Sequence, residues 1–583
     1  MMAVLDLPDG IERLPRTVTP FAGRLLCAAL VLAGFSLLTA LWFAPLLPHL
    51  STALLGPPED NMQDLWNSWH AATATGWHDF IHTRQIRFPE GTPLYYHSFA
   101  YPQVLAVALL TKLFGTGFAT LVALHNLTLL AAFPLAGAGA FYLARHLMAD
   151  VPGRDAAAAM AGFIFAFNPW HVAQAMHHTH VTTIQFLPFF VLCYLVALER
   201  RSFALLALAA VLDALSALSS WYYFFYLFYF MAFHLLWLRI RKGSWPWGWN
   251  FAAPTLVCLG AGLLLLPWAI PMARSGMDTH LYYVGSNMFV ADLAAYFAFP
   301  PTHLLASWGA NVYAALTGNA WEDVVYLGLV AVAVFIAALW ATRKAPDADR
   351  KLLRYGLGGM IFFAAIASGD CLHVNGHVLT WLHMPNAALG KLPFFANVRT
   401  PARAIVMVYL FLGLGVGQAL LLAWRGNRNW RIGTIAAAAL MLVDFFPAPS
   451  ALALTDATCP PGLSVIAADP EKGFGVLDLP GGYENGNAYM MLSACHGRAI
   501  VAGETSRQIG TTLRDRMDMQ DMAVQRRQLV AAHVKYIVLH APRPGQFQWQ
   551  APDSEQEDGN RDAYLRTYPR IWHSPELTIL KVY

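Results

Sequence analysis

Long apolar runs recur in this chain from Arg24 to Pro447, and they constrain the fold more than any other feature. Several of them are long enough to cross about 30 Å of hydrocarbon as a helix. Hydrophobic residues make up 57% of the 583 residues and charged residues 13%, a balance that a soluble protein of this length would rarely tolerate. The first run, Leu25 to Leu47, is too long for a cleaved signal peptide. The sequence therefore predicts an all-α, multi-pass membrane protein.

Basic residues indicate how the chain crosses the membrane. We expect about eleven spans, at roughly residues 24–48, 118–143, 156–170, 181–198, 203–219, 221–238, 251–271, 323–342, 352–368, 401–424 and 432–447. With a cytoplasmic N-terminus, the short inner segments hold most of the arginines and lysines, as the positive-inside rule requires. Phe99–Gly115 is also apolar, but it is short and carries Pro102 and Lys112. Counting it as a span would invert every later loop, so we predict an interfacial or re-entrant helix there.

These spans divide the chain into a membrane domain, residues 1–448, and a tail, residues 449–583. Because the number of spans is odd and the N-terminus is cytoplasmic, the tail is expected on the outer side. The outer segments that are large enough to build a site are 49–117, 168–180, 272–322 and 369–400. The inner loops are short and basic, and they contain no Gly-rich phosphate loop and no nucleotide fingerprint. This disfavours an enzyme with a cytosolic nucleotide donor, and we expect the functional surface to face outward.

The tail has the pattern of a small soluble α/β domain. Phe474–Leu479 and Val534–Leu539 are short apolar runs bounded by Gly, Pro or His, which is typical of buried strands. Arg514–His533 is predicted to be a polar helix, and Leu577–Tyr583 could supply a last strand. Residues 542–562 are rich in Pro, Gln, Asp and Glu and are predicted to form a loop.

Three cysteines lie outside in this topology: Cys371, Cys459 and Cys495. They allow one disulfide, for which Cys459 with Cys495 is the most plausible pair. The number is odd, however, and spacing alone does not decide the pairing.

The segment Glu59–His70 combines acids with tryptophans at helical period. Asp60 and Asp64 fall on one face, and Trp66 and Trp69 fall on the opposite face with other apolar residues. The simplest interpretation is a solvated helix face, or a helix N-terminus that favours acids. The alternative is a helix held at a membrane interface by its tryptophans. A carboxylate near such a low-dielectric boundary would have a raised pKa, which suits a general base.

Cations in the outer loops are candidates for binding a phosphate. Arg84 and His97 belong to the loop after the acidic helix and could bind a phosphate. The alternative is that these basic residues attract lipid headgroups without forming a specific site. Arg399 and Arg403 lie in the segment Asn397–Arg403 at the outer edge of a span. Positive residues at the outer edge of a span run against the positive-inside rule, so each needs a compensating partner such as a bound phosphate or an acid.

Histidines and one glutamate complete the candidates. Asn168-Pro169-Trp170-His171 is followed closely by His177, His178 and His180. A metal site is one interpretation, but the spacing is irregular and the cluster contains no carboxylate, so hydrogen bonding to a substrate or loop packing is favoured. Glu322 lies just before a span on the outer side. It is either a simple boundary residue or the acid that pairs with Arg403.

Taken in order, these residues resemble the GT-C superfamily of membrane glycosyltransferases, and within it the bacterial multi-pass proteins that decorate cell-envelope polymers. The matching points are Asp60–Trp69, Pro93–His97, Asn168-Pro169 with its histidines, Glu322 before Tyr326-Leu327-Gly328, and Phe394–Arg403. The tail from Val476 to Arg507 also looks like the outer domain of such proteins. The resemblance covers most of the membrane part and depends on the order of the motifs more than on any single one.

The resemblance implies a sugar linked to polyprenyl phosphate as donor and a catalytic acid in the first outer loop. Asp60 is the best match for that acid, with Asp64 second and Glu322 as a further catalytic candidate. His97 and Arg84 fall near the position where relatives contact the lipid phosphate, and His97 replaces a lysine there. His171 and His178 are expected to help bind the substrate, as are Arg399 and Arg403 named above.

The expected function is therefore sugar transfer to an envelope glycan, lipid or protein on the outer face of the bacterial inner membrane. A divalent cation is allowed, but no residue is assigned as a metal ligand, and no nucleic-acid partner is expected. The alternatives are a transporter or flippase for a lipid-linked or amphipathic substrate, and a non-catalytic subunit of envelope assembly. A transporter predicts charges that line a path at the midplane. Here Asp213 is nearly alone in that region, which favours an enzyme.

Overall fold

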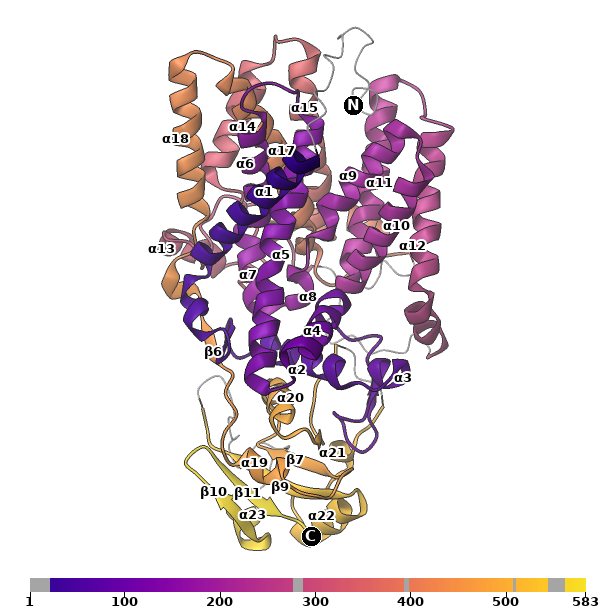
Figure 1. The fold of residues 1–583 in the computed structure, drawn as a ribbon, viewed down its shortest axis with the longest axis vertical. Helices are drawn as coiled ribbons and strands as arrows, with labels where there is room; N and C mark the ends of the chain where they lie inside the picture. Colours follow the sequence, from indigo (N-terminus) through magenta and orange to yellow (C-terminus); the bar gives the residue numbers. More distant parts are fainter. Residues whose placement is uncertain (1–20, 276–286, 393–397, 507–509, 544–560) are drawn as a thin grey trace.

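The computed structural model describes residues 21–275, 287–392, 398–506, 510–543 and 561–583 of the chain. The molecule is elongated, with a bundle of helices at one end and a smaller unit that contains a β-sheet at the other (Figure 1). The C-terminus lies in the smaller unit, at the end remote from the bundle.

Six stretches of the described chain are long and apolar enough to cross a membrane. They lie in α1 (Phe21–Trp42), α5 (Phe118–Leu147), α8 with α9 (Thr179–Thr182 and Phe186–Arg200), α11 (Trp221–Lys242), α12 (Trp249–Arg274) and η3 with α17 (Pro401–Ala404 and Ile405–Trp424). The pair α6 (Arg154–Ala166) and α7 (Pro169–His177), bent by 40°, would make a seventh. The protein is thus a multi-pass membrane protein. Helices also cover the other expected spans, namely α10 (Phe203–Ser219), α14 (Leu329–Ala341), α15 (Asp347–Ala367) and α18 (Arg428–Phe445). The total of about eleven spans stays a prediction.

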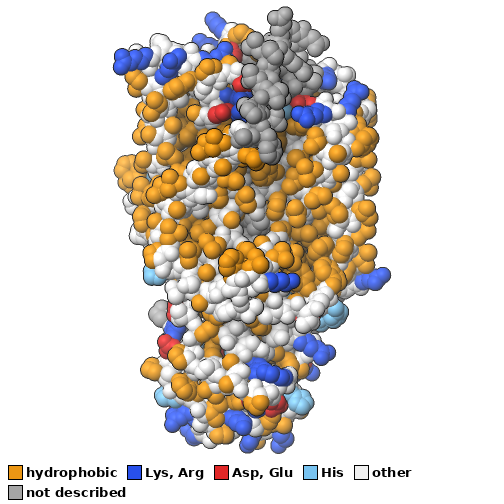
Figure 2. Space-filling view, viewed as in Figure 1, with side chains coloured by type: hydrophobic (Ala, Val, Ile, Leu, Met, Phe, Trp, Pro, Cys, Tyr) orange, Lys and Arg blue, Asp and Glu red, His pale blue; other side chains and the backbone are white. Residues whose placement is uncertain are grey.

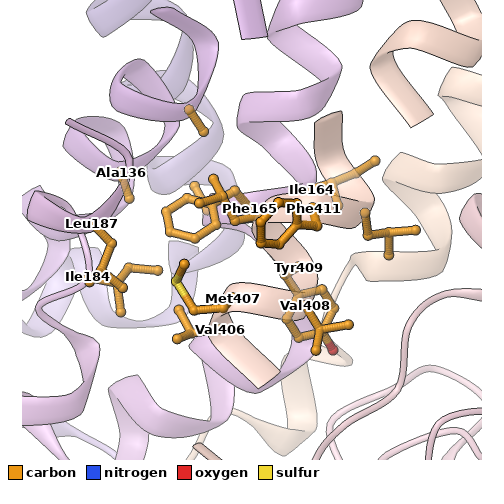
Figure 3. Packing of buried hydrophobic residues seen from close by; sticks show 14 of the residues in the cluster. Ala136, Ile164, Phe165, Ile184, Leu187, Val406, Met407, Val408, Tyr409 and Phe411 are labelled. Carbon is orange, nitrogen blue, oxygen red and sulfur yellow. The ribbon is translucent and has the colours of Figure 1, made fainter. Parts of the chain in front are cut away.

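The helix α17 forms the centre of the bundle. Its residues Val406, Met407 and Phe411 pack against Phe165 of α6 and Leu187 of α9 (Figure 3). Gly413 allows α6 to approach closely, because a Cβ at this position would lie 2.7 Å from the carbonyl oxygen of Ala161.

The outside of the bundle is largely apolar. Large side chains such as Leu259 and Leu263 of α12 are exposed. On the face shown in Figure 2, hydrophobic side chains form a broad band, and charged side chains gather toward the two ends. This distribution fits a band of hydrocarbon around the bundle.

The apolar stretch that we did not count as a span forms α4 (Tyr101–Phe114), a helix of 14 residues. It contacts α2 (Asp60–Thr73) and α5 where the bundle meets the tail (Figure 1). Its length is below what a crossing requires. An interfacial position remains the prediction for this helix.

A mixed sheet of five strands forms the core of the tail. The strand order is β10 (Arg570–His573), β11 (Leu577–Lys581), β9 (Val534–His540), β7 (Gly475–Leu479) and β8 (Ala499–Ile500). The strand β7 runs parallel to both β8 and β9, and β11 is antiparallel to β9. The strands predicted at Phe474–Leu479, Val534–Leu539 and Leu577–Tyr583 are confirmed as β7, β9 and β11.

The single helix predicted over Arg514–His533 is wrong in extent. The chain forms α21 (Leu513–Arg516) and α22 (Met522–Ala531) instead. Asp521 is the N-cap of α22 and accepts hydrogen bonds from the backbone N–H groups of Ala523 and Val524, so the helix begins there. Most of the predicted loop over 542–562 lies outside the described residues.

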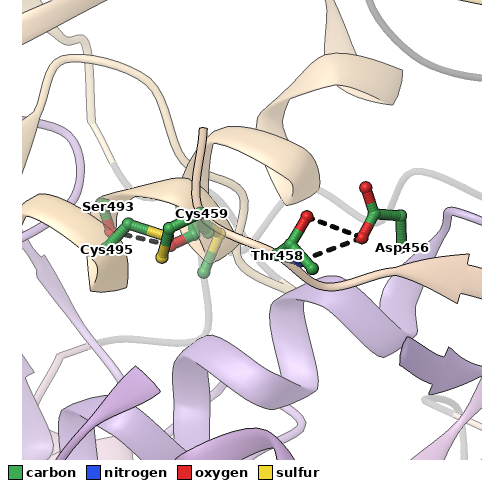
Figure 4. The surroundings of a disulfide bond; sticks show 6 residues. Asp456, Thr458, Cys459, Ser493 and Cys495 are labelled. Carbon is green, nitrogen blue, oxygen red and sulfur yellow. Dashed lines mark hydrogen bonds between the residues drawn. A yellow bond between two sulfur atoms is a disulfide. The ribbon is translucent and has the colours of Figure 1, made fainter. Parts of the chain in front are cut away.

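The structure confirms the disulfide between Cys459 and Cys495 (Figure 4). It joins the end of α20 (Tyr483–His496) to the chain just after β6 (Leu454–Asp456). The strand β6 in turn pairs antiparallel with β1 (Ala53–Leu55), which precedes α2. The first outer segment and the tail are thus tied together beside α2. Cys371 is buried and is not in a disulfide.

Candidate active site

Most of the tryptophan face of α2 is covered by protein, so the prediction that this face lies against the membrane is wrong for Trp66, whereas Trp69 is partly exposed. Met62, Leu65 and Trp66 are at most 1% exposed. They belong to one hydrophobic cluster with Tyr489 and Met490 of α20 in the tail. Helical period identifies which face of a helix is buried, but it does not identify what buries it.

The two acids of α2 lie in different surroundings. The side chain of Asp60 is 41% exposed, and its Oδ1 accepts a hydrogen bond from Asn487 Nδ2 of α20 at 3.1 Å. Asp64 is 4% exposed. Its carboxylate accepts hydrogen bonds from the backbone N–H of Thr179 at 3.0 Å and from Asn67 Nδ2 at 3.3 Å. Asp60 can therefore meet a substrate, whereas Asp64 ties α2 to the start of α8.

Both carboxyls bind protons more tightly than in water. Desolvation by the protein packed around the carboxyl, with the charge of Glu59 added, raises the pKa of the partly exposed Asp60 to about 6. Burial, with the charge of Asp60 added, raises the pKa of Asp64 to about 7. The two acids titrate as an interacting pair. A carboxylate that ionises near neutral pH is suited to general base catalysis.

His178 lies between Asp60 and Glu322. Asn168 caps the N-terminus of α7 by accepting the N–H of His171, Pro169 occupies the first turn, and the helix ends just before His178. The Nε2 atom of His178 is 3.6 Å from Asp60 Oδ2, and its Nδ1 atom is 3.8 Å from Glu322 Oε1. This brings together side chains that are far apart in the sequence.

Glu322 forms an ion pair with Arg403 of η3. Arg403 Nε donates to both carboxylate oxygens, at 3.0 and 3.2 Å, and a second guanidinium nitrogen also contacts Oε1. The two side chains are only 5% and 9% exposed. Burial acts to raise the pKa of Glu322, but the charge and the hydrogen bonds of Arg403, with smaller contributions from nearby groups, together outweigh it and hold this pKa below its usual value. We call Asp60, His178, Glu322 and Arg403 the tail-end cluster, because they meet at the end of the bundle that faces the tail.

Aromatic and basic groups surround Arg403. Its guanidinium lies over the ring of Tyr222, 5.2 Å from the centroid, and its Nη1 is 3.5 Å from His180 Nε2. The backbone N–H of Arg399 donates to the hydroxyl of the same Tyr222, so Arg399 flanks the cluster. Asn397, at the start of the segment Asn397–Arg403 in which we predicted these arginines to act, lies outside the described residues.

Three predicted binding residues do not join the cluster. Arg84 is exposed on the turn after β2 (His82–Thr83). His97 is buried, with Nε2 3.0 Å from Asn67 Oδ1, and burial lowers its pKa to about 3, so it carries no charge for a phosphate at neutral pH. Both ring nitrogens of His171 face backbone carbonyls, of Ala166 at 2.6 Å and Thr182 at 2.8 Å, so its role is packing.

The structure adds contacts that the sequence did not indicate. Glu59 pairs with His177 at 3.0 Å, and the ring of His177 stacks on Trp321. Gln174 contacts His178 from one helical turn earlier, a spacing that could have indicated the contact. Asn487 reaches Asp60 across 427 residues of sequence, and no local signal indicates such a contact.

No group of three or more His, Cys, Asp or Glu side chains is arranged to hold a metal ion in the part of the chain that the structure describes. The two acids and the histidine of the tail-end cluster are donor types that a divalent cation accepts, but the charge of Glu322 is engaged by Arg403. A divalent cation stays allowed, with no residue assigned as its ligand.

The fold is that of the GT-C glycosyltransferases. The structure is similar to the arabinofuranosyltransferase AftD from Mycobacteria, with a TM-score of 0.56 and 13% identity over 96% of this chain and 40% of AftD, so the chain spans less than half of that protein. Residues 29–446 match the family described as Domain of unknown function (DUF6311), and the chain belongs to this family.

Two further solved structures give lower scores. They are the oligosaccharyltransferase of Archaeoglobus fulgidus (TM-score 0.49, 11% identity, 88% of this chain and 69% of that one) and ArnT from Cupriavidus metallidurans bound to undecaprenyl phosphate (TM-score 0.48, 11% identity, 97% and 99%). No curated protein matches the sequence.

Proposed function

We propose that the protein is a membrane glycosyltransferase that moves a sugar from a polyprenyl-phosphate donor to a cell-envelope acceptor. The observation that carries this proposal is the tail-end cluster. In it, the accessible carboxylate of Asp60 has a raised pKa, and only the ring of His178 separates it from the buried Glu322–Arg403 pair. The GT-C fold supports it, because this fold is shared with proteins that transfer sugars. A lipid-linked donor suits a site at the end of a membrane bundle.

The proposed reaction uses Asp60 as the general base. Asp60 takes the proton of an acceptor hydroxyl while the hydroxyl oxygen forms a bond to the anomeric carbon of the donor sugar. The bond between that carbon and the phosphate oxygen breaks, and the polyprenyl phosphate leaves with the electron pair. Because the membrane holds the lipid at a fixed depth, much of the rate enhancement would come from positioning.

Cations are needed where charge develops on the departing phosphate. Arg403 is already neutralised by Glu322 in the described structure. Arg399 lies beside it, is partly exposed, and its charge helps to lower the pKa of His178. We assign the phosphate contacts to Arg399, which is partly exposed, and to Arg403. Of the basic residues predicted from the sequence, this leaves out Arg84 and the uncharged His97.

The proposal includes the orientation in the bacterial inner membrane, with the N-terminus in the cytoplasm and residues 449–583 as an extracytoplasmic domain. The distribution of arginines and lysines supports it. The disulfide between Cys459 and Cys495 also supports it, because disulfides persist in oxidising compartments and are rare in the cytoplasm.

The test is a transfer assay with the purified full chain in lipid nanodiscs. A panel of radiolabelled polyprenyl-phosphate sugars serves as donor, and a bacterial envelope fraction serves as acceptor. Nucleotide sugars are the control donors, from which no transfer is expected. We expect transfer from a lipid-linked donor only, lost in Asp60→Asn and retained in the control Asp347→Asn at the opposite end of the bundle. Absence of transfer by the unaltered protein across the panel would contradict the proposal.

A further inference from the structure

The ring of His178 has a different partner at each nitrogen. Its Nδ1 lies 2.9 Å from Gln174 Oε1, which is hydrogen-bond distance. Its Nε2 lies 3.6 Å from Asp60 Oδ2, which is longer than a hydrogen bond. In a neutral imidazole one nitrogen carries the hydrogen and the other carries a lone pair. The hydrogen-bond partners of the two nitrogens decide which of them carries the hydrogen.

The orientation of the Gln174 side chain settles this choice. Its amide nitrogen faces the backbone carbonyl oxygen of Trp321 at 3.3 Å and Glu322 Oε2 at 3.4 Å. A carbonyl and an ionised carboxylate can only accept, so the NH2 group of the amide has to be at this end. Oε1 is then the atom that faces His178, and Oε1 also can only accept. The hydrogen therefore lies on Nδ1 of His178, and Nε2 presents its lone pair to Asp60.

The surroundings keep the ring neutral. The pKa of His178 is lowered to about 3, mainly by burial; Glu322 acts in the opposite direction without outweighing it, and the charge of Arg403 adds to the lowering. The titratable and charged groups that face this ring are Asp60 from α2, His177 from α7, His180 from α8, Glu322, Arg399 and Arg403. Gln174 itself is fully buried, so water does not replace its contact with Nδ1.

We propose that Gln174 is a positioning residue that holds His178 with its hydrogen on Nδ1, so that Nε2 accepts a hydrogen bond from Asp60 once Asp60 has been protonated by the acceptor. This inference rests on the proposed function. The O–H bond of the acceptor breaks, an O–H bond forms on Asp60, and His178 gains no proton.

The distance of 3.6 Å between His178 Nε2 and Asp60 Oδ2 fits a hydrogen bond that forms only when Asp60 is protonated. An ionised Asp60 and the lone pair of Nε2 are two acceptors with no hydrogen between them, so they stay apart. Protonation of Asp60 supplies the missing hydrogen and allows the pair to close. A hydrogen bond that forms only as the proton moves stabilises the transition state more than the ground state, and such a bond raises the rate of the chemical step.

The first test reads the tautomer directly and needs no substrate. Histidine-selective 15N NMR of the full chain in lipid bilayers would be recorded for the unaltered protein and for Gln174→Met, with the His178 signal assigned by its loss in His178→Asn. We expect the hydrogen on Nδ1 in the unaltered protein and a change of tautomer in Gln174→Met. A hydrogen on Nε2 in the unaltered protein would overturn the inference, even if the variant does not fold.

The second test uses the transfer assay. Gln174→Met should lower kcat about fivefold, equivalent to about 1 kcal/mol, and leave KM for the donor unchanged. The acid limb of its kcat profile should move to lower pH, because protonated Asp60 loses its acceptor. Gln418→Met is the matched control, the same exchange on α17 beside Asp349 at the opposite end of the bundle.

The two proposals fail in different ways. If the unaltered protein transfers sugar and Asp60→Asn does not, while Gln174→Met keeps the normal tautomer and pH profile, only the role of Gln174 is wrong. If the unaltered protein transfers nothing from any lipid-linked donor, the proposed function fails, and the role of Gln174 in transfer fails with it.

Discussion

The two ends of the helical bundle hold their charges in different ways. At the end remote from the tail, Arg241 pairs with Asp347 and Arg425 with Asp349, and these side chains are 23–48% exposed. At the tail end, Glu322 and Arg403 are 5% and 9% exposed. Exposed ion pairs contribute about 0–1 kcal/mol, whereas loss of one partner from a buried pair costs about 3–5 kcal/mol. Charge pairs at the remote end therefore add little to stability, whereas the tail end retains buried charge at a cost that the proposed function explains.

Breaking the buried pair should give the largest change in stability. Glu322→Gln leaves the guanidinium of Arg403 buried without its counter-charge, and we expect the free energy of unfolding to fall by about 3–5 kcal/mol. Thermal unfolding in nanodiscs measures this. The double variant Glu322→Gln/Arg403→Met should recover most of the stability but not the transfer activity. If Glu322→Gln unfolds at the same temperature as the unaltered protein, the pair is not the energetic feature described.

Acidification should lower activity before it lowers stability. Asp60 acts as a base only when it is ionised, so kcat should fall about tenfold per pH unit below about pH 6. Because the folded-state pKa of Asp60 is raised from 3.8, proton uptake through pH 6 favours the folded state, and this group cannot cause acid unfolding in that range. Parallel pH profiles of kcat and of the unfolding temperature measure the two effects. A kcat profile that stays flat from pH 7 to pH 5 would contradict the assignment of Asp60.

The contact between the tail and Asp60 should have a smaller effect. Asn487 donates a hydrogen bond to Asp60 and lowers its pKa, although burial still dominates. In Asn487→Ala the acid limb of the kcat profile should therefore move to higher pH, by less than one unit for a bond worth about 1 kcal/mol. A shift to lower pH would show that the tail acts on Asp60 in another way.

The smallest effect is expected at the remote end. Asp347 accepts from Arg241 and also contacts Arg354 at 3.1 Å, and its side chain is 36% exposed. Asp347→Asn should change the free energy of unfolding by less than about 1 kcal/mol and should leave transfer unchanged. A loss as large as that in Glu322→Gln would remove the contrast between the two ends.

Local sequence patterns predicted the elements well and their partners poorly. The apolar runs of β7 and β9 were recognisable because buried strands need nothing beyond their own residues to be identified. The tryptophan face of α2 was recognised as apolar, but its cover, α20, lies more than 400 residues away in sequence. Helical spacing therefore could not tell protein from membrane.

The same limit applies to the candidate site. Asp60, Glu322 and Arg403 were separate candidates on the outer side, with Glu322 offered as one possible partner for Arg403, and the structure brings the three together around His178. Arg84 was predicted to bind the phosphate because it is a basic residue of the first outer loop, but it lies exposed on the turn after β2 and outside the cluster. Burial removes the charge of His97, and burial depends on tertiary packing that no local pattern reports.

The most direct measurement compares Asp60→Asn with Asp64→Asn in the same transfer assay. The two acids share one helix and one chemistry, but only Asp60 is accessible, whereas Asp64 accepts a backbone N–H that an asparagine oxygen can also accept. We predict a loss of about 10²- to 10⁴-fold in kcat for Asp60→Asn and retention of most activity in Asp64→Asn. The opposite order, or full activity in Asp60→Asn, would contradict the assignment of the tail-end cluster as the active site.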